Sequence, residues 1–506
     1  MITLDGYSLT IQDVIAVCKD FAEVRISESC FEKINKSRNF VEKILAENRV
    51  VYGITTGVGE LANTLISPEE SETLQLNLIR SHSVGVGDPL SEEVVRGMMI
   101  LRANALVQGH SGVRKELIDF LVAMLNHRIY PYIPEQGSVG ASGDLAPLSH
   151  LALAMIGEGE CLVDGKRVVA AEALQDKGLS PVTLLCKEGL ALINGTQVMG
   201  AIGCLVVAEA ELLLKNAQIA GSMSLEALRG TARAFDEKIH KLRPYVGQVK
   251  VAANIRKLVE GSSIISSHTN CEKVQDAYTL RCMPQVYGSI IDTIEYAKKV
   301  LSVEINSVTD NPLIFPDEEE VISGGNFHGE PLAFIMDFLG IALAEIANIS
   351  ERTVDRLVNP HLSGLPPFLS PKSGLNSGYM IAQYTAAALV SENKVLAHPS
   401  SVDSIPTSAG QEDHVSMGTI GARNAITIIK NVEQVLAIEM LCAAQGMDFV
   451  PQEPGKGTVV AHRTIRGKVK ELTDDRILYR DIETTRNMVV SGEVVREVEA
   501  AVGSLS

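Results

Sequence analysis

Long helical patterns with few charges dominate the second part of this chain, and they constrain its fold more than any other feature. They cover residues 196–228, 283–306, 331–357, 378–396 and 415–444, and the tail from residue 482 reads as a last helix. Helices this long and this apolar suit a bundle in which neighbours cover several faces of each helix. The same apolar coverage predicts that subunits pack together, because one chain does not hide it all.

One stretch, residues 189–208, runs 20 residues without a charge. That length could span a bilayer. The stretch contains Asn194, Thr196 and Gln197, however, and charges flank it closely on both sides. We therefore favour a buried core helix over a membrane span.

The first part of the chain is mixed, because short helical patterns alternate with glycine-rich turns near residues 52–59, 85–89 and 136–143. Residues 160–169 predict a small hairpin that turns at Asp164-Gly165. We expect a mainly α fold, with a mixed N-terminal domain over 1–195 and a long-helix bundle with a C-terminal helical region over 196–506.

Composition excludes several classes of partner. Lys and Arg number 45 against 62 Asp and Glu, giving a net charge of −17, which disfavours nucleic acid and anionic membrane surfaces. The N-terminus carries no secretory signal pattern. The eight cysteines are scattered with no CxxC pair, which indicates free thiols in a reducing cytoplasm; they are residues 18, 30, 161, 186, 204, 271, 282 and 442.

Two common cofactor signals are weak or missing. Residues 57–62 fit G-x-G-x-x-A, but no strand–turn–helix pattern surrounds them, so a structural turn or a mobile loop presenting Tyr52 is the better interpretation. The sequence has no HExxH and no paired Cys/His spacing, and we predict no metal site.

The most unusual segment is 134–150, PEQGSVGASGDLAPLSH. By itself it reads as a glycine-rich approach to an apolar helix, with Asp144 as N-cap and the helix running to about residue 156. Ala141-Ser142-Gly143 also permits a reaction. The Gly143 nitrogen is unhindered, the Ala141 carbonyl has little side-chain bulk beside it, and the Ser142 hydroxyl can leave as water. Loss of two waters would give a five-membered ring with an exocyclic methylidene, if the surrounding structure forces the bend.

Residues 137–149, GSVGASGDLAPLS, resemble the motif of the aromatic amino acid ammonia-lyases, and the resemblance extends over nearly the whole chain. In that family Ala-Ser-Gly matures autocatalytically to 4-methylidene-imidazole-5-one. The resemblance implies the ammonia-lyase/fumarase-like helix bundle and a carbon–nitrogen lyase. It further implies no external cofactor, and a cytoplasmic homotetramer whose active sites combine residues from three chains.

The resemblance also implies roles for individual residues. Tyr52 matches the catalytic tyrosine, and Asn194 matches a residue near the amine and the ring. Arg281 matches the group that grips the substrate carboxylate, with Tyr278 and Gln275 as neighbouring family positions. From the residues alone, Tyr52 could pack over a glycine turn, Asn194 could cap a helix, and Arg281 could form an intersubunit ion pair.

A further aromatic matches a family position. Phe327 corresponds to a residue that packs on the active site. From the residues alone, Phe327 could simply pack in the hydrophobic core. Gln275, Tyr278 and Arg281 would share one face only if their segment were helical.

Two segments resemble the branch of the family that acts on histidine. Ser81-His82 falls where that branch carries Ser-His, and residues 411–417 read QEDHVSM. Gln411 and Glu412 would then lie in the substrate site, where Glu412 accepts the imidazole N–H and His82 meets the other ring nitrogen. The alternative without a functional role is that Glu412 is an ordinary acidic residue at the start of a helix. Gly410 and Val58 depart from the usual Asn and Phe of the branch and the family.

The expected reaction is elimination of ammonia from L-histidine to give trans-urocanate, the first step of histidine degradation. The alternative on the same scaffold is a tyrosine or phenylalanine ammonia-lyase or an aminomutase. A fumarase-type lyase is a weaker rival, because residues 261–265, GSSII, lack the Met-Pro and Lys of its loop. A helical scaffold without activity is the non-enzymatic alternative.

Overall fold

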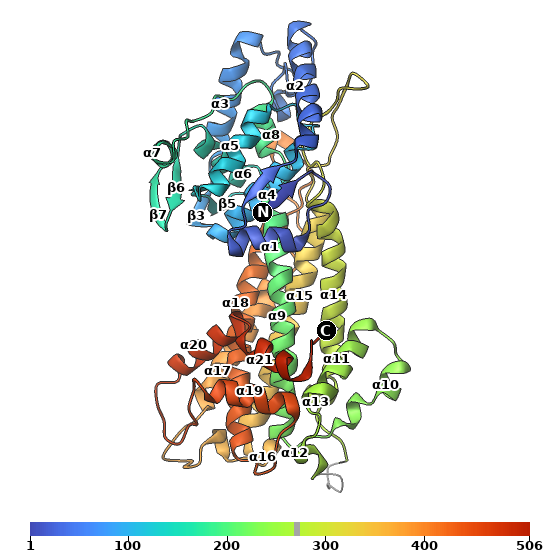
Figure 1. The fold of residues 1–506 in the computed structure, drawn as a ribbon, viewed down its shortest axis with the longest axis vertical. Helices are drawn as coiled ribbons and strands as arrows, with labels where there is room; N and C mark the ends of the chain where they lie inside the picture. The colour runs from blue at the N-terminus through green and yellow to red at the C-terminus, as the bar shows by residue number, and fades with distance from the viewer. Residues whose placement is uncertain (268–273) are drawn as a thin grey trace. The chain divides into compact units, whose positions relative to one another are not determined.

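The chain folds mainly into helices, with a few short strands and the loops that connect them (Figure 1). A computed structural model describes residues 1–267 and 274–506. The chain divides into two compact units, each drawn from three stretches. Unit 1 comprises Met1–Leu205, Ala297–Asp337 and Pro399–Arg423, and unit 2 comprises Val206–Tyr296, Phe338–His398 and Asn424–Ser506. The expected mainly α fold is confirmed, and the domain boundary expected after residue 195 stays a prediction.

Unit 1 contains the short elements that the mixed first part of the sequence predicts. Its helices start where polar side chains can cap them: Thr10 and Asp13 form a capping box at α1, and Ser91 caps α4. The helices of this unit are α1 (Ile11–Asp20), α2 (Phe31–Ala46), α3 (Ser71–His82), α4 (Glu92–Leu106), α5 (Lys115–Asn126), α6 (Ala146–Met155), α7 (Ala170–Asp176) and α8 (Glu188–Ile193).

The described strands are short and form four small sheets. A parallel pair joins β1 (Ile2–Leu4) to β2 (Val24–Ile26), and antiparallel pairs join β3 (Val86–Pro89) to β5 (Pro134–Gln136) and β8 (Leu313–Phe315) to β9 (Glu320–Ile322). The fourth sheet contains β4 (Tyr130–Pro131), β6 (Glu160–Val163) and β7 (Lys166–Val169).

The hairpin predicted over residues 160–169 is confirmed. Val163 pairs with Lys166, and Asp164 and Gly165 between them have φ of 49° and 74°. Two consecutive residues with positive φ match the twist that a two-residue hairpin turn requires, which Asp-Gly supplies at low cost.

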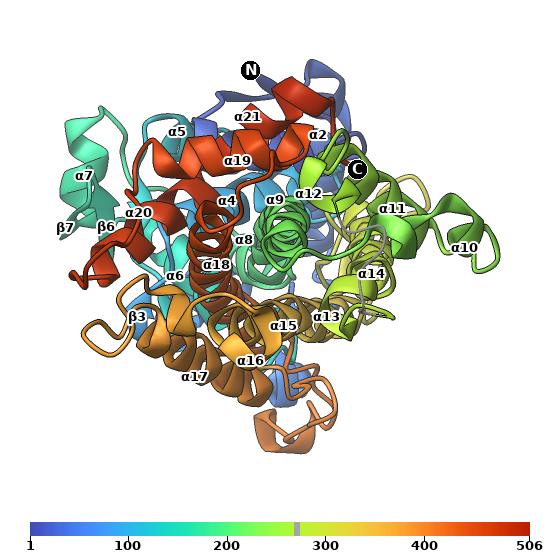
Figure 2. The same cartoon turned by 90° about the horizontal axis from the view of Figure 1, so that it is seen from below.

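Four long helices confirm the predicted patterns within a few residues. In unit 2, Ser224 of α9 and Ser350 of α15 donate hydrogen bonds to the two carboxylate oxygens of Glu439 on α18, at 3.0 and 2.6 Å. These three helices therefore run side by side there (Figure 2). The long helices are α9 (Gln197–Ala227), α14 (Met283–Glu304), α15 (Glu330–Val358) and α18 (Gly418–Asp448).

The uncharged stretch 189–208 is not one helix as expected. It is divided between α8 and α9, because α8 ends at Ile193 and α9 begins at Gln197. Two helices, α9 and α15, are long and apolar enough to cross a membrane, but 78% and 67% of their most apolar windows are buried inside the fold. Burial among protein side chains accounts for their apolar composition.

The remainder of unit 2 consists of shorter helices. The predicted last helix is two helices, because Gly492 with φ of 69° separates α20 from α21. The shorter helices are α10 (Glu237–Lys241), α11 (Val246–Leu258), α12 (Ser263–Ser266), α13 (Tyr278–Arg281), α16 (Pro360–Ser363), α17 (Met380–Leu396), α19 (Lys456–Arg466), α20 (Tyr479–Val490) and α21 (Glu493–Val502).

The seven cysteines within the described residues are free thiols, and six of them are buried. Cys271 lies outside the described residues. Free buried thiols agree with the reading of scattered cysteines as unpaired.

Candidate active site

The segment with Ala141-Ser142-Gly143 is a sequence of tight bends before α6. Gly140 and Gly143 have φ of 69° and 73°, and Leu145 has φ of 46°. A Cβ on Gly143 would lie 2.1 Å from the carbonyl oxygen of Gly195. Only glycine fits this backbone at that distance, so the third residue of the tripeptide has to be glycine.

The loop that contains residues 415–417 also holds this segment in place. The amide of Met417 donates to the carbonyl of Val139 at 2.9 Å, and the Ser416 hydroxyl donates to the carbonyl of Gly140 at 3.2 Å. Ala141, Val415 and Met417 form a small buried apolar cluster. The QEDHVSM segment therefore packs directly on the tripeptide, which explains why both motifs occur in one chain.

Asp144 does not cap α6 as expected. Leu145 is the N-cap of α6, and the buried Asp144 carboxylate instead accepts a hydrogen bond from the amide of Val198 in the first turn of α9, at 2.6 Å. Burial raises the pKa of Asp144 to about 7, opposed by these amide hydrogen bonds. Asp144 thus ties the residue after the tripeptide to a helix that begins 53 positions later.

Ser142 and Glu412 meet directly. The Ser142 hydroxyl donates to Oε1 of Glu412 at 3.1 Å, and the Thr407 hydroxyl donates to Oε2 at 2.8 Å. His82, the last residue of α3, is half-buried. Burial lowers the pKa of His82, and the nearby Glu412 charge opposes that shift. Glu412 therefore contacts the tripeptide directly, and His82 lies near enough to Glu412 for its charge to act on the imidazole.

The loop before Glu412 has an unusual backbone. Ser408, Ala409 and Gly410 have φ of 52°, 54° and 88° in succession. Left-handed conformations at two non-glycine residues cost free energy and are typical of functional loops. At Gly410, where the histidine branch usually has Asn, a Cβ would meet nothing within 4 Å, so there is room for the larger side chain. Gln411 follows and is exposed.

Tyr52 stands at the start of a tight loop that runs to Gly59. Its hydroxyl accepts a hydrogen bond from the amide of Gly59 at 3.1 Å. Val58, which replaces the usual Phe, packs near Gly53. The short 3₁₀ helix that follows, η2 (Gly59–Asn63), contacts η6 (Ser408–Gly410). No strand leads directly into residues 57–62, so the loop lacks the strand–turn–helix context of a dinucleotide-binding turn, and it lies near the Glu412 segment.

Asn194 is buried in the turn between α8 and α9. Its side-chain amide donates to the carbonyl of Asn311 at 3.1 Å, while its Oδ1 has no hydrogen-bond partner among the described residues. The next residue, Gly195, pairs with Gly143 in a parallel bridge. Asn194 therefore adjoins the tripeptide and has one acceptor available for a ligand.

Gln275, Tyr278 and Arg281 lie in unit 2, at and before α13. Tyr278 and Arg281 share one face of this short helix, as the helical alternative predicted, and the guanidinium lies 4.5 Å from the Tyr278 ring centroid. Tyr278 is 71% exposed, and the buried Arg281 Nε has no partner among the described residues. Gln275 is exposed and precedes the helix.

Phe327 is half-buried in the turn that precedes α15. Near it, the potential ligand atoms of His328, Glu330 and His414 all lie within 4.8 Å of one another. His328 Nδ1 accepts the Glu330 amide at 3.3 Å, so Nε2 carries the proton toward His414 Nδ1 at 3.4 Å. This is a hydrogen-bonded imidazole pair, and because 86 positions separate its two histidines, no spacing motif predicts the cluster.

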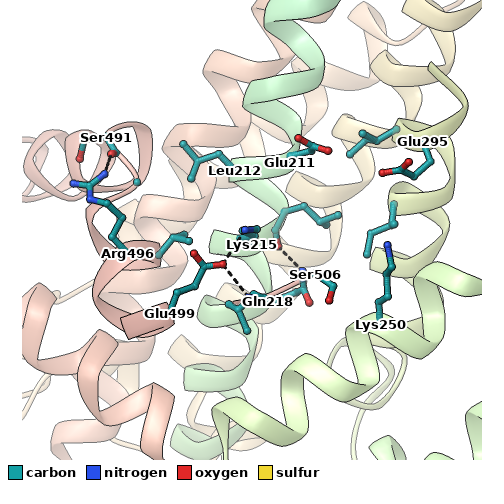
Figure 3. A pocket seen from close by; sticks show the side chains of 16 residues that line it. Glu211, Leu212, Lys215, Gln218, Lys250, Glu295, Ser491, Arg496, Glu499 and Ser506 are labelled. Carbon is teal, nitrogen blue, oxygen red and sulfur yellow. Dashed lines mark hydrogen bonds and ion pairs between the residues drawn. The ribbon is translucent and has the colours of Figure 1, made fainter. Parts of the chain in front are cut away.

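A cavity of about 560 Å³ lies within unit 2 (Figure 3). Side chains of both charges line it, and Lys215 pairs with Glu499 at 2.8 Å. None of the predicted site residues lines this cavity. Its mixed charge selects no particular class of ligand.

The tripeptide loop fits the prosthetic group that the resemblance implies. The bends at Gly140 and Gly143 compress residues 141–143, and Ala141 is buried with 6% exposure. Ser142 is only half-buried, and its hydroxyl faces the Glu412 carboxylate. The Oδ1 atoms of Asp144 and Asn194 are buried without partners among the described residues, so polar atoms surround the tripeptide.

The sequence did not reveal several buried charged side chains near the site. Arg102 on α4 donates to the Asn194 carbonyl at 2.8 Å, and Lys187 pairs with Asp310 at 2.7 Å with both side chains fully buried. One signal was available: Arg102 is a lone charge in the apolar run GMMILRANALV. A charged residue inside a buried helix pattern predicts a specific partner.

Comparison with known proteins places the chain in a family. The model for aromatic amino acid lyases matches residues 9–467. A histidine ammonia-lyase of Alkaliphilus oremlandii (strain OhILAs) is 56% identical over 502 residues, 99% of each chain. The crystal structure of histidine ammonia-lyase from Trypanosoma cruzi has a TM-score of 0.92 and 45% identity, covering 99% of this chain and 95% of that one.

A second solved structure shows that the fold does not select the substrate. Tyrosine aminomutase from Streptomyces globisporus has a TM-score of 0.95 and 39% identity, with both chains fully covered. Enzymes named for different reactions thus share this fold, and the chemistry has to be argued from the site. On the match over 9–467 and the identity to its relatives, this chain belongs to the aromatic amino acid lyase family.

Proposed function

We propose that this chain eliminates ammonia from L-histidine to give trans-urocanate, acting as a carbon–nitrogen lyase. The observation that carries the proposal is the contact between Ser142 and Glu412, which puts the reactive tripeptide beside the carboxylate of the histidine-branch motif. The 56% identity to a histidine ammonia-lyase over nearly the full chain supports the same substrate. Such an enzyme begins histidine degradation, and we expect it in the cytoplasm.

The prosthetic group of this proposal is 4-methylidene-imidazole-5-one, formed from Ala141-Ser142-Gly143 without an external cofactor. When present, the group supplies an electrophile that no unmodified side chain offers. The residues that would hold it are the Gly195 backbone against Gly143, the Val198 amide on Asp144, and the Met417 amide on Val139.

Two residues, Tyr52 and Asn194, would take part in the elimination itself. Tyr52 is the proposed base for the substrate β-proton, and the Gly59 amide that donates to its hydroxyl holds that oxygen in place. Asn194, through its unpartnered Oδ1, would accept a hydrogen bond from the substrate amine. Phe327 would pack against the substrate, and Gln411 would line the same site beside Glu412.

Imidazole recognition is the proposed role of His82 and Glu412. Glu412 accepts hydrogen bonds from Ser142 and Thr407, so its oxygens are oriented before substrate arrives. Because its pKa is lowered by burial, His82 is neutral near pH 7 and can accept or donate at one ring nitrogen. A phenyl ring would leave both side chains unpaired, which favours histidine over phenylalanine.

The substrate carboxylate is proposed to bind Arg281, with Tyr278 and Gln275 beside it. A guanidinium fork matches a carboxylate, and the buried Nε of Arg281 has no hydrogen-bond partner within the described part of the chain. The 71% exposure of Tyr278 on unit 2 suits a residue that completes a site in a neighbouring copy of the chain. We therefore propose a homotetramer with shared active sites.

Exposed apolar side chains support this assembly. Tyr296, Phe338 and Ile341 are 50%, 43% and 49% exposed along one groove between α14 and α15 in unit 2. A second copy of the chain would remove this apolar surface from water.

The substrate proposal is tested by assaying the purified enzyme with histidine, tyrosine and phenylalanine. Release of urocanate from histidine, with little coumarate or cinnamate, is the expected result. An enzyme that ignores histidine and deaminates or isomerises tyrosine would instead establish the alternative, an aromatic ammonia-lyase or aminomutase on the same scaffold.

The shared site is tested by mixing two inactive variants. Ser142→Ala lacks the reactive hydroxyl, and Arg281→Met lacks the carboxylate ligand. If sites combine residues from different copies, subunit exchange between the two variants restores part of the activity, and light scattering gives a tetramer. If each chain supplies a complete site, mixing restores nothing.

A further inference from the structure

Arg102 is a fully buried cation that is not used by any role described above. Its side chain has no exposed surface, and it makes no ion pair within 4.0 Å among the described residues. The nearby charges of Asp310 and Asp144 favour its protonation, while burial lowers its pKa to about 10. A buried guanidinium costs desolvation free energy, so its retention points to a specific task.

The guanidinium of Arg102 is fixed on one turn. Its Nη1 donates to the Asn194 carbonyl at 2.8 Å and to Oε1 of Gln197 at 3.0 Å. Gln197 is held in turn, because its side-chain amide donates to the Thr309 hydroxyl at 2.9 Å. A Cβ on Gly195 would lie 2.5 Å from Nη1, so the guanidinium packs directly against this backbone.

The opposite side of the same turn touches the tripeptide. The Gly195 carbonyl accepts the Asp144 amide at 2.7 Å, and Gly195 pairs with Gly143. The oxygen of Gly195 stands where a side chain on Gly143 would have to be. The turn at 194–195 is therefore compressed between Arg102 on one side and Gly143 on the other.

We propose that Arg102 is a positioning residue for maturation of Ala141-Ser142-Gly143, acting through the Asn194-Gly195 turn. This inference rests on the proposed prosthetic group. Ring closure forms a bond from the Gly143 nitrogen to the Ala141 carbonyl carbon. The carbonyl oxygen then leaves as water with the two hydrogens of the Gly143 and Ser142 amides, and the Ser142 hydroxyl leaves as a second water with the hydrogen on its own Cα.

Loss of the two waters needs neither an oxidant nor a reductant. The activation barrier to ring closure therefore depends mainly on the geometry of the loop. The Gly143 nitrogen has to be pressed onto the Ala141 carbon, and a rigid turn behind Gly143 prevents the loop from relaxing away. The planar guanidinium reaches two acceptors from one nitrogen, whereas a lysine in its place offers a more mobile ammonium.

The test uses Arg102→Lys in the full chain, followed from synthesis onward. The measurement is the fraction of the peptide containing residues 141–143 that has lost two waters, together with Tm and assembly size. We expect a folded, assembled variant whose rate of water loss is at least about tenfold below that of the parent. The matched control is Arg96→Lys on the same helix, a buried arginine that donates instead to the Cys18 carbonyl and should mature at the parental rate.

Maturation of Arg102→Lys at the parental rate would overturn the inference and leave the proposed function intact. A parent chain that loses no water would overturn the proposed function instead. If Arg102→Lys does not fold, Gln197→Met decides, because it removes one of the two acceptors that hold the guanidinium. Slower water loss in that variant supports the inference, and an unchanged rate contradicts it.

Discussion

The hydroxyl of Ser142 donates a hydrogen bond to the carboxylate of Glu412 at 3.1 Å, although 270 positions separate the two residues in the chain. One partner belongs to the tripeptide proposed to become an electrophile, and the other to the group proposed to bind the imidazole. The proposed reaction and the proposed recognition of the imidazole are therefore adjacent in unit 1, and single substitutions can separate the two roles.

Replacement of Ser142 by alanine removes the leaving hydroxyl and leaves the backbone unchanged. We expect Ser142→Ala to fold and assemble, to lose no methylidene-forming water, and to turn over histidine at least about a thousandfold more slowly. Ser149→Ala is the control, because that hydroxyl bonds only the Leu145 carbonyl in α6. Turnover close to the parental rate in Ser142→Ala would rule out the proposed electrophile.

Replacement of Glu412 or His82 should harm substrate recognition and spare maturation. We expect Glu412→Ala and His82→Leu each to lower kcat/KM for histidine by about a hundredfold or more, because an unpaired buried imidazole is costly. The peptide over 141–143 should still have lost two waters. Asp413→Asn, at the exposed neighbouring carboxylate, should behave as the parent. The account of recognition fails if both Glu412→Ala and His82→Leu retain normal turnover.

Gly143→Ala and Gly165→Ala form a matched pair for the backbone at the tripeptide. The two glycines have nearly the same φ, 73° and 74°, but a Cβ would meet the Gly195 oxygen at 2.1 Å in the first and nothing within 4 Å in the second. Both variants carry the left-handed strain of about 1 kcal/mol. Only Gly143→Ala should fail to lose water by intact mass, and equal maturation of the two would show that the close approach is unimportant.

Glu439 should make stability fall as pH rises. Burial raises its pKa from 4.5 to about 7, so between these values the folded chain binds one proton that the unfolded chain does not. The stability that this proton contributes, on the order of 3 kcal/mol, is lost as the pH rises from 4.5 to 7. Above pH 7 the free energy of unfolding no longer changes through this group. The Tm of Glu439→Gln relative to the parent should therefore increase from pH 5 to pH 7.5.

The control for this titration is Glu471→Gln at an exposed carboxylate. Its Tm difference from the parent should stay nearly constant over the same range. Other buried acids, including Asp144, give the parent curve the same sign, so the comparison of variant and parent isolates Glu439. A Tm difference for Glu439→Gln that is flat or decreases with pH would contradict the assignment.

The sequence predicted helices and turns well where they depend on residues that are close together in the chain. The long apolar patterns gave the long helices within a few residues, and Asp164-Gly165 gave the hairpin, because periodicity and left-handed turns depend on neighbours in the chain. The tail from residue 482 was predicted as one helix and is two, since the break at Gly492 depends on its positive φ rather than on periodicity.

Long-range polar contacts were the part that the sequence did not reveal. Asp144 looked like the cap of the helix that follows it, but its carboxylate binds the first turn of α9, and no local pattern distinguishes these two outcomes. At the break at Asn194-Gly195 inside an uncharged stretch, Arg102 donates to the Asn194 carbonyl and Gly195 pairs with Gly143. Such contacts depend on the packed fold, which spacing along the chain does not encode.

Accurate mass of freshly purified active enzyme, mapped by peptide to residues 137–149, tests the central claim most directly. The account predicts that this peptide weighs two waters less than its unmodified sequence and that the methylidene-forming water is not lost in Ser142→Ala. A fully hydrated peptide in enzyme that still converts histidine to urocanate would contradict it.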